Sequence, residues 1–243
     1  MDNSEQVIEI EGLEFRWQPA GDPTLQIDHF AVTRGERIFI KGESGSGKST
    51  LLSLLGGVLT PQRGTITLLG ETINSLPGAK RDRFRADHIG FIFQMFNLIP
   101  YLSVVENVVL PLHFSKRRRK RVEERHSAGE EAERLLGHLD LSGELLHRPV
   151  TELSVGQQQR VAAARALIGS PELVIADEPT SSLDADRRQA FIELLIRECD
   201  EAGNTLLFVS HDSSLESHFN HTLPLGAINR AVADSKERAD GDR

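Results

Sequence analysis

Apolar residues in this sequence fall into short runs, separated by longer segments in which apolar and charged residues recur with helical spacing. The short runs predict strands, at residues 7–17, 25–30, 37–41, 64–69, 88–93, 173–176 and 205–210. The helical patterns lie at residues 49–55, 104–146, 161–168 and 185–201. Because strands alternate with helices, we expect an α/β domain with a mainly parallel sheet and catalytic groups at the carboxyl ends of its strands.

The pattern along the chain predicts one domain with a subdomain and a tail. The long helical pattern after residue 104 predicts a helical subdomain at about 95–165. The last segment, 231–243, is mostly charged and cannot bury enough apolar surface to fold, so we predict that it is disordered. We expect residues 1–230 to form a single domain, because a chain of this length can build one large α/β core.

A basic block, Lys-Arg-Arg-Arg-Lys-Arg at residues 116–121, interrupts an otherwise acidic chain and is followed by several glutamates. The interpretation that we favour is a solvated helix face that carries ion pairs within the helix. The alternative is a contact with anionic lipid or with an acidic partner.

Composition excludes several classes of protein. The chain has 243 residues and a formal charge of −8, and the field of such a protein repels the phosphate backbone of nucleic acids. The single cysteine, Cys199, excludes a disulfide within the chain, suits a reducing cytoplasm and is expected to be buried. The N-terminus lacks the pattern of a secretory signal, and no stretch reaches 18 uninterrupted apolar residues. We therefore expect a protein that is neither secreted nor membrane-spanning by itself.

The clearest motif is Gly-Glu-Ser-Gly-Ser-Gly-Lys-Ser-Thr at residues 42–50, which fits the phosphate-loop pattern G-x-x-x-x-G-K-[ST] between a predicted strand and a predicted helix. Its glycines let consecutive backbone N–H groups point at phosphate oxygens, at the positive end of the helix. Lys48 would then contact the β and γ phosphates, and Ser49 would bind Mg²⁺. The predicted nucleotide-binding residues of the loop are Gly42, Glu43, Ser44, Gly45, Ser46, Gly47, Lys48, Ser49 and Thr50.

Polar residues that follow three other predicted strands are candidates for the chemistry. Asp177 and Glu178 end the strand at 173–176, where an aspartate can hold Mg²⁺ and a glutamate can deprotonate the water that attacks the γ-phosphate. Gln94 follows the strand at 88–93, so its amide could contact Mg²⁺ or that water. His211 follows the strand at 205–210 and could hydrogen-bond the γ-phosphate.

A second helix start with anion-binding features begins at Leu153-Ser-Val-Gly-Gln157. Ser154 and Gln157 form the pattern of a capping box, which by itself is only a well-made helix start. Gly156 favours an anion-binding role for this helix start. A glycine in the first turn costs helix stability but lets a phosphate approach the backbone N–H groups. Two such helix starts in one chain cannot close on the same phosphates without crowding. The sequence therefore favours a dimer in which the phosphate loop of one copy faces the helix start at Ser154 of the other copy.

In combination these motifs resemble those of the ATP-binding subunits of ABC transporters. The correspondences run in chain order: residues 42–49 resemble the Walker A motif, Gln94 the Q-loop, residues 153–157 the signature, residues 173–178 Walker B, residues 181–184 the D-loop and His211 the switch histidine. Trp17 lies where the family places an aromatic residue that stacks on adenine. Residues 91–107 and 176–180 are similar to the lipoprotein-release, macrolide-export and cell-division group (the LolD, MacB and FtsE type). The resemblance covers about residues 7–225, and Val155 departs from the first glycine that the signature usually has.

The resemblance implies a P-loop ABC ATPase domain with a mainly parallel core sheet, a small antiparallel β subdomain and a helical subdomain. It implies a homodimer that uses ATP and Mg²⁺, lies on the cytoplasmic face of the membrane and drives a separate permease in export, lipoprotein release or mechanotransmission. By this resemblance the catalytic residues are Glu178, His211, Gln94 and Lys48, the Mg²⁺ ligands are Ser49, Gln94 and Asp177, and the nucleotide contacts outside the phosphate loop are Trp17, Ser154, Gly156, Gln157 and Asp184.

The alternative within the same superfamily is a soluble ABC ATPase that works without a membrane partner. The segment from Gln94 to Ser154 is too short for the coiled-coil insertion of the repair type, and the second set of motifs that the translation type carries is absent. A P-loop kinase or GTPase would leave the signature unexplained, and the chain has no Asn-Lys-x-Asp motif for guanine.

Overall fold

The computed structural model describes residues 6–43 and 45–231. These residues form two compact units. The first unit contains the residues up to Arg85 and those from Val209 onward, and the second contains Ala86–Phe208. The tail that we predicted to be disordered lies, apart from its first residue, outside the described residues.

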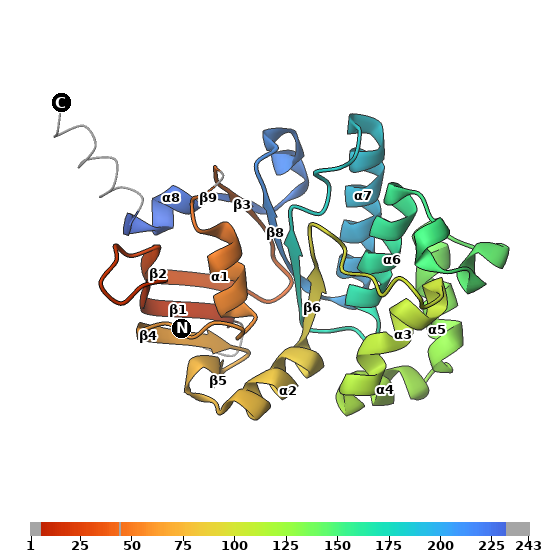
Figure 1. Cartoon of the computed structure of the whole chain (residues 1–243), viewed down its shortest axis with the longest axis horizontal. Coiled ribbons are helices and arrows are strands. Elements are labelled where there is room, and N and C mark those ends of the chain that lie inside the picture. The colour runs from red at the N-terminus through yellow and green to blue at the C-terminus, as the bar shows by residue number, and fades with distance from the viewer. Residues whose placement is uncertain (1–5, 44, 232–243) are drawn as a thin grey trace. The chain divides into compact units, whose positions relative to one another are not determined.

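A four-stranded antiparallel sheet lies in the first unit, with the strand order β2, β1, β4, β5 (Figure 1). Its strands are β1 (Gln6–Phe15), β2 (Leu25–Thr33), β4 (Arg63–Leu68) and β5 (Glu71–Thr72). Ile10 of β1 lies opposite Phe30 of β2 on one side and Ile66 of β4 on the other, and all three residues are buried. The alternating pattern that predicted β1 therefore places its apolar side chains in the core of this unit.

The first unit also holds the strand and the helix that flank the phosphate loop. β3 (Arg37–Lys41) pairs in parallel with β9 (His221–Pro224), and Phe39 of β3 is fully buried. α1 (Lys48–Leu55) follows the loop, and the short helix α8 (Leu225–Ile228) contacts β2. The apolar runs at residues 37–41 and 49–55 thus form the predicted strand and helix.

The sequence patterns did not predict α2 (Gly78–His88), the helix in which the chain passes from the first unit to the second. This helix has no buried residue. Without an apolar stripe, it lacks the periodicity by which a helix is identified from sequence.

Three strands lie side by side, with β7 (Leu173–Asp177) between β6 (Ile89–Ile92) and β8 (Thr205–Ser210). They belong to the second unit except for the last two residues of β8. β6 and β7 run parallel, and the last residue of β6 lies opposite Ala176. Most residues of the three strands are buried. This continuous burial is typical of parallel strands that helices cover on both faces, and it explains why the strands appear in the sequence as uninterrupted apolar runs.

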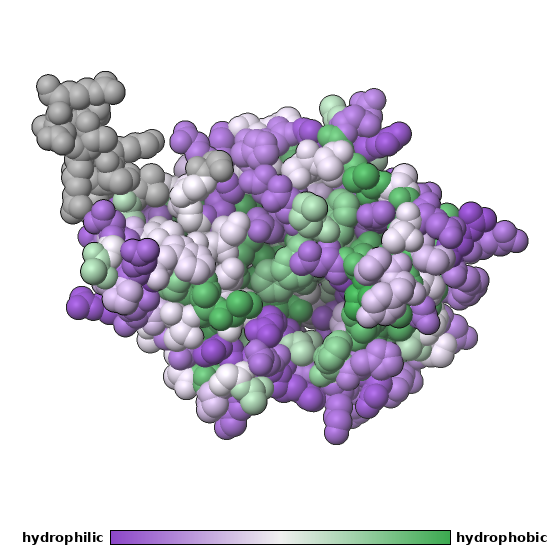
Figure 2. Space-filling model, in the orientation of Figure 1, coloured by the Kyte–Doolittle hydropathy of each residue, from purple (hydrophilic) through white to green (hydrophobic). Residues whose placement is uncertain are grey.

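Five helices complete the second unit (Figure 1): α3 (Val104–Phe114), α4 (Lys116–Glu123), α5 (Ala128–His138), α6 (Val155–Leu167) and α7 (Ala185–Ala202). α3 packs against both α5 and α6. The surface over α4 and α5, at the lower right of Figure 2, is mostly hydrophilic, as expected for helices that turn one face to the core. Cys199 is buried in α7, as predicted.

In the described ranges 6–43 and 45–231, no helix is long and apolar enough to cross a membrane. The parallel strands, the flanking helices and the separate antiparallel sheet agree with the predicted α/β fold class.

Candidate active site

The phosphate loop holds its lysine by contacts to its own backbone. Lys48 is 8% exposed, and its Nζ donates to the carbonyl oxygens of Gly42 at 2.7 Å and of Glu43 at 2.9 Å. Gly47, which precedes α1, has φ of 99°, a left-handed conformation that favours glycine. A Cβ atom at Gly47 would lie 2.9 Å from Cδ2 of Leu25, so space also requires a glycine there. Gly47 has no side chain that could cap α1, which leaves the positive end of the helix to an anion.

The residues before and after this lysine in the loop differ in their exposure to solvent. Glu43, Gly45 and Ser49 are exposed, whereas Thr50 is buried in α1, and Ser44 lies outside the described residues. The carbonyl of Ser46 accepts a weak hydrogen bond of 3.4 Å from the side chain of Asn229.

Asn229 was not predicted to belong to the site. This fully buried residue follows α8; its Nδ2 donates to the carbonyl of Thr24 at 3.0 Å, and its Oδ1 accepts from the backbone N–H of Gln26 at 2.9 Å. The side chain therefore ties the C-terminal part of the first unit to β2 and to the phosphate loop. Oδ1 also accepts from the backbone N–H of the nearby Ala231 at 3.2 Å. No local pattern indicates the tie itself, because Thr24, Gln26 and Ser46 lie about 180 or more residues away in the chain.

Two other predicted residues also lie in the first unit. Trp17 is 63% exposed just after β1, and its ring meets Phe15 edge-on, with the ring centroids 5.3 Å apart. An aromatic face that remains largely in solvent is available for stacking on a base. His211 is exposed directly after β8, and the next residue, Asp212, caps the turn that follows by accepting from the N–H of Ser214.

In the second unit the strand pairing brings Gln94 and Asp177 to the same edge of the parallel sheet. Ile92 of β6 lies opposite Ala176 of β7, and each strand ends within two residues of that pair. Gln94 is exposed, and Asp177 is partly exposed. An amide and a carboxylate thus lie at the same edge of the sheet, and their oxygens are of the type that a hard cation such as Mg²⁺ prefers.

Glu178, the predicted catalytic base, has a positive φ of 42°. A non-glycine residue in this left-handed region carries backbone strain, and such strain concentrates at functional sites. Its carbonyl oxygen accepts a hydrogen bond from the N–H of Ser181 at 3.3 Å, within the turn that leads to α7. Asp184, from the same turn, caps α7 by accepting from the N–H of Arg187 at 3.0 Å.

The helix start that we likened to the signature forms the predicted capping box. Ser154 Oγ accepts from the N–H of Gln157, and Gln157 Oε1 accepts from the N–H of Ser154 at 2.9 Å. A Cβ atom at Gly156 would meet nothing closer than Leu183, at 3.9 Å, so the packing of this unit does not require a glycine. The open space over this first turn is therefore compatible with the approach of an external phosphate.

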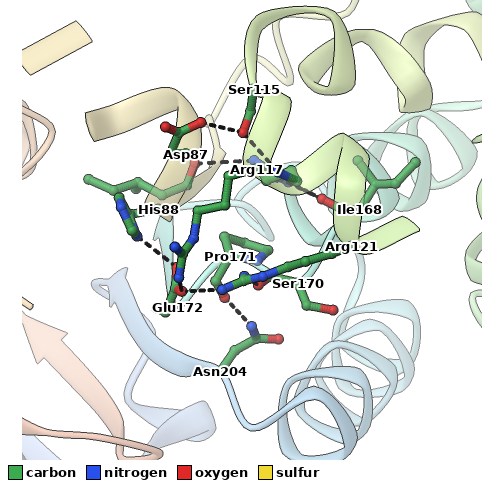
Figure 3. Close-up of polar contacts among 12 residues, drawn as sticks. Asp87, His88, Ser115, Arg117, Arg121, Ile168, Ser170, Pro171, Glu172 and Asn204 are labelled. Atoms are coloured by element: carbon green, nitrogen blue, oxygen red, sulfur yellow. Dashed lines mark hydrogen bonds and ion pairs between the residues drawn. The ribbon is translucent and has the colours of Figure 1, made fainter. Parts of the chain in front are cut away.

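The basic block at residues 116–121 agrees with our preferred interpretation in part and corrects it in part. Arg119 and Lys120 are exposed and pair within the helix region with Glu123 and Glu124. Arg118 is buried, and the exposed Arg117 and the partly exposed Arg121 bind Glu172, which lies outside their own helix, as Figure 3 shows. Arg117 Nη2 lies 2.8 Å and Arg121 Nη2 lies 2.5 Å from Glu172 Oε1, while His88 Nδ1 lies 2.9 Å from Oε2 of the same carboxylate. The block therefore holds α4 to the start of β7.

Arg118 is the most deeply placed of these residues. It is 2% exposed, and its guanidinium donates to the carbonyl oxygens of Ile168 and Ala166, just after and near the end of α6. Burial lowers the pKa of Arg118 to about 10, so the group keeps its charge at neutral pH. Burial alone would raise the pKa of the Glu172 carboxyl, but the hydrogen bonds from His88, Arg121 and Arg117 hold that pKa well below its ordinary value.

Another group of possible metal ligands, His138, Glu198 and Glu201, lies in the second unit, with its ligand atoms within 4.8 Å of one another. Arg134 Nη1 lies 3.3 Å from His138 Nδ1. The pKa of Arg134 is raised, chiefly by its hydrogen bond to Glu131 and further by the charges of Glu198 and Glu201. A guanidinium already supplies the positive charge that these carboxylates need, so we assign no metal to this group.

Known proteins show the same organisation. A family model described as ABC transporter matches residues 25–181. The lipoprotein-releasing system ATP-binding protein LolD of Porphyromonas gingivalis is 41% identical over 193 residues, which cover 79% of this chain and 85% of LolD. The macrolide export ATP-binding/permease protein MacB of Escherichia coli is 38% identical over 232 residues, which cover 94% of this chain but 34% of MacB. The dimeric post-hydrolysis structure of the ATP-binding cassette MJ0796, bound to ADP and Pi, has a TM-score of 0.78 at 33% identity and covers 90% of this chain and 95% of that one.

The chain therefore belongs to the ABC transporter family. It is an ATP-binding subunit of the LolD and MacB type, as the resemblance implied, and the transport interpretation is supported over the non-transport alternative. Membership in this family of ATPases implies that the chain binds and hydrolyses ATP.

Proposed function

We propose that this chain acts as a homodimeric, Mg²⁺-dependent ATPase that drives a separate membrane permease, as a translocase. The observation that carries the proposal is the presence of two helix starts suited to phosphate: α1 behind the phosphate loop, and α6, where Gly156 leaves open space. In the proposed dimer, two ATP molecules lie between the phosphate loop of one copy and Ser154 and Gly156 of the other. The MJ0796 cassette, which is dimeric and bound to ADP and Pi, supports a nucleotide-binding dimer.

The names and lengths of the relatives support a separate permease. LolD is named an ATP-binding protein, and the match covers 85% of it. MacB is named an ATP-binding/permease protein, and the match covers 34% of it. We infer that this chain corresponds to the ATP-binding part, folded as a single domain over residues 1–230 with a helical subdomain at about 95–165. We place it in the cytoplasm, peripheral on the inner face of the membrane, where it would serve export, lipoprotein release or mechanotransmission.

The residues present fit the proposed chemistry. The hydroxyl of Ser49, the carboxylate of Asp177 and the amide oxygen of Gln94 are the oxygen ligands that Mg²⁺ prefers, and the bound ion would neutralise charge on the phosphates. Lys48 would bind the β and γ phosphates, and Glu178 would take the proton of the attacking water.

The other assigned residues would bind and orient the nucleotide. His211 would donate a hydrogen bond to the γ-phosphate, and Trp17 would stack on adenine. Across the dimer, Ser154, Gly156 and Gln157 would contact the phosphates of the ATP held by the partner copy. Asp184, at the start of α7, would lie beside that nucleotide.

Mixed dimers test this proposal. Lys48→Ala removes the ammonium that binds the phosphates and Ser154→Arg blocks the opposing helix start, so each homodimer should be inactive. A heterodimer of the two variants keeps one intact composite site, and we expect tagged, purified heterodimers to recover part of the wild-type ATPase rate. Absence of recovery in proven heterodimers would argue against the shared site, provided that a single site turns over alone.

Ser127→Arg is the matched control for this experiment. Ser127 caps α5 with the same type of capping box, formed with Glu130, but it belongs to no predicted site. The Ser127→Arg homodimer should keep its ATPase activity, which would show that Ser154→Arg does not act merely through the loss of a helix cap.

A further inference from the structure

The loop that carries Gln94 has a backbone conformation that is unfavourable for the residues in it. Phe96 and Asn97 have φ angles of 58° and 50°, so two successive non-glycine residues occupy the left-handed region. Gln94 itself is exposed, and in the described part of the chain its side chain makes no hydrogen bond. Its position therefore depends on how the backbone two and three residues further along is held.

Arg165, near the end of α6, holds this backbone. Its Nη2 donates to the carbonyl oxygen of Phe96 at 2.5 Å, and its Nη1 donates to that of Asn97 at 2.7 Å. The residue is 9% exposed, and burial lowers its pKa. No carboxylate pairs with Arg165 among residues 6–43 and 45–231, so these two carbonyls are what compensates its charge.

The far end of the loop is held from another helix. Asn107 of α3 is fully buried; its Oδ1 accepts from the N–H of Ile99 at 2.8 Å, and its Nδ2 donates to the carbonyls of Ile99 and Leu102. The half of the loop next to Gln94 is thus the half that depends on Arg165. Arg165 therefore acts on the part of the loop next to Gln94, whereas Asn107 supports the part that is farther from Gln94.

We propose that Arg165 is a positioning residue that fastens the Gln94 loop to the helix that begins at Ser154. α6 is continuous between the two residues, a distance of about 16 Å along a rigid helix, so a displacement of its start also moves Arg165. A nucleotide bound at Ser154 and Gly156 would in this way set the position of the Gln94 amide. The inference rests on the proposed function, in which Gln94 acts on Mg²⁺ or on the attacking water.

Arg165→Lys tests the role with little change in volume or charge. A lysine is a single point donor and cannot reproduce the planar fork on two carbonyls. We expect normal thermal stability and normal ATP affinity without Mg²⁺, but a kcat that is roughly 10-fold to 10²-fold lower, because small misplacements of a reacting group have effects of this size. We also expect faster hydrogen exchange of the amides of residues 96–99. Arg165→Gln is the second variant if the lysine variant does not fold.

The matched control is Arg160→Lys, in the same helix. Arg160 also donates to a backbone carbonyl, that of Leu139 at 3.1 Å, and to the carboxylate of Asp140, and within the described residues it makes no side-chain hydrogen bond to the Gln94 loop. It should leave kcat and the exchange of residues 96–99 at wild-type values. Wild-type kcat and exchange in Arg165→Lys would overturn the proposal.

A double variant separates this inference from the proposed function. If Arg165 acts through Gln94, adding Arg165→Lys to Gln94→Ala should lower kcat no further, because the two losses are not independent. Multiplicative losses would overturn the action through Gln94. A wild-type kcat in Gln94→Ala would instead refute the proposed role of Gln94, and would overturn the catalytic part of the inference with it. The exchange rates would still decide whether Arg165 holds the loop.

Discussion

The phosphate loop and the basic block of α4 both place a buried cation against backbone carbonyls, yet they differ in where those carbonyls come from. Lys48 binds the carbonyls of Gly42 and Glu43, six and five residues away. Arg118 binds the carbonyls of Ala166 and Ile168, 48 and 50 residues away.

This difference in sequence separation matches a difference in role: Lys48 serves to bind an anion, whereas Arg118 supports the fold. The contacts of Lys48 are part of a local loop whose backbone is shaped to receive an anion, so its ammonium can exchange carbonyls for phosphate oxygens. The guanidinium of Arg118 cannot leave its carbonyls for another partner at so little cost. These carbonyls lie near the end of a helix, where they have few other donors. The comparison shows that a run of positive charge in a sequence need not be positive charge on a surface, and that its structural role is decided by distant partners.

Lys48→Ala should have the largest effect on function. Removing one phosphate-binding donor lowers turnover by roughly 10²–10³-fold in comparable sites, and we expect a loss of at least this size in the ATPase rate. Thermal stability should change little, since the two local carbonyls become accessible to water. Lys80→Ala, on the exposed face of α2, is the control and should be fully active. A turnover within a few-fold of wild type in Lys48→Ala would contradict the assignment.

Arg118→Met should show the opposite behaviour, a large loss of stability. Each buried carbonyl left without a donor costs about 1–3 kcal/mol of unfolding free energy, and two carbonyls are affected. We expect a fall in Tm on the order of 4–12 °C, measured by circular dichroism. Arg119→Met, at the exposed neighbour that forms a long pair of 3.8 Å with Glu123, should stay within about 0.5 kcal/mol of wild type. Equal Tm values for the two variants would refute the special role of Arg118.

Glu172→Gln should have a smaller effect, and one that depends on pH. The pKa of Glu172 lies below its unfolded value of about 4.3, so the carboxylate contributes stability above that pH and loses the contribution as pH falls toward the folded pKa. We expect the variant to be less stable by about 1.5–3 kcal/mol at pH 7, and the difference to shrink below about pH 4. Denaturant unfolding at several pH values measures this difference. Glu193→Gln, on the exposed side of α7, should show no such trend, and a difference constant down to pH 3 would contradict the ion-pair account.

The smallest effect should come from the exposed half of the block. A triple variant with glutamine at residues 116, 119 and 120 removes three cations that make at most long intrahelical pairs, of 3.8 Å and 4.0 Å. We expect stability within about 0.5 kcal/mol of wild type and unchanged sedimentation with anionic vesicles. A salt-dependent loss of vesicle binding would instead support the lipid contact that we considered for the whole block.

The sequence alone determined what depends on local order. The phosphate loop, the capping box of Ser154 and Gln157, and the carboxylates at the end of β7 are defined within a few residues each, because turns, caps and strand ends are set by neighbouring side chains and backbone. The apolar runs likewise identified the buried strands, since burial on both faces leaves a continuous pattern.

Tertiary structure alone decided the roles of residues whose partners are distant in the chain. Arg118, Arg165 and Asn229 each satisfy backbone groups dozens to hundreds of residues away, and no periodicity or motif marks them. The helix α2 was hidden for a related reason, because it buries no apolar stripe. Hydrogen bonds of this kind form only after the chain has closed long loops, so the identity of their partners is a property of the folded protein and cannot be obtained from the order of its residues.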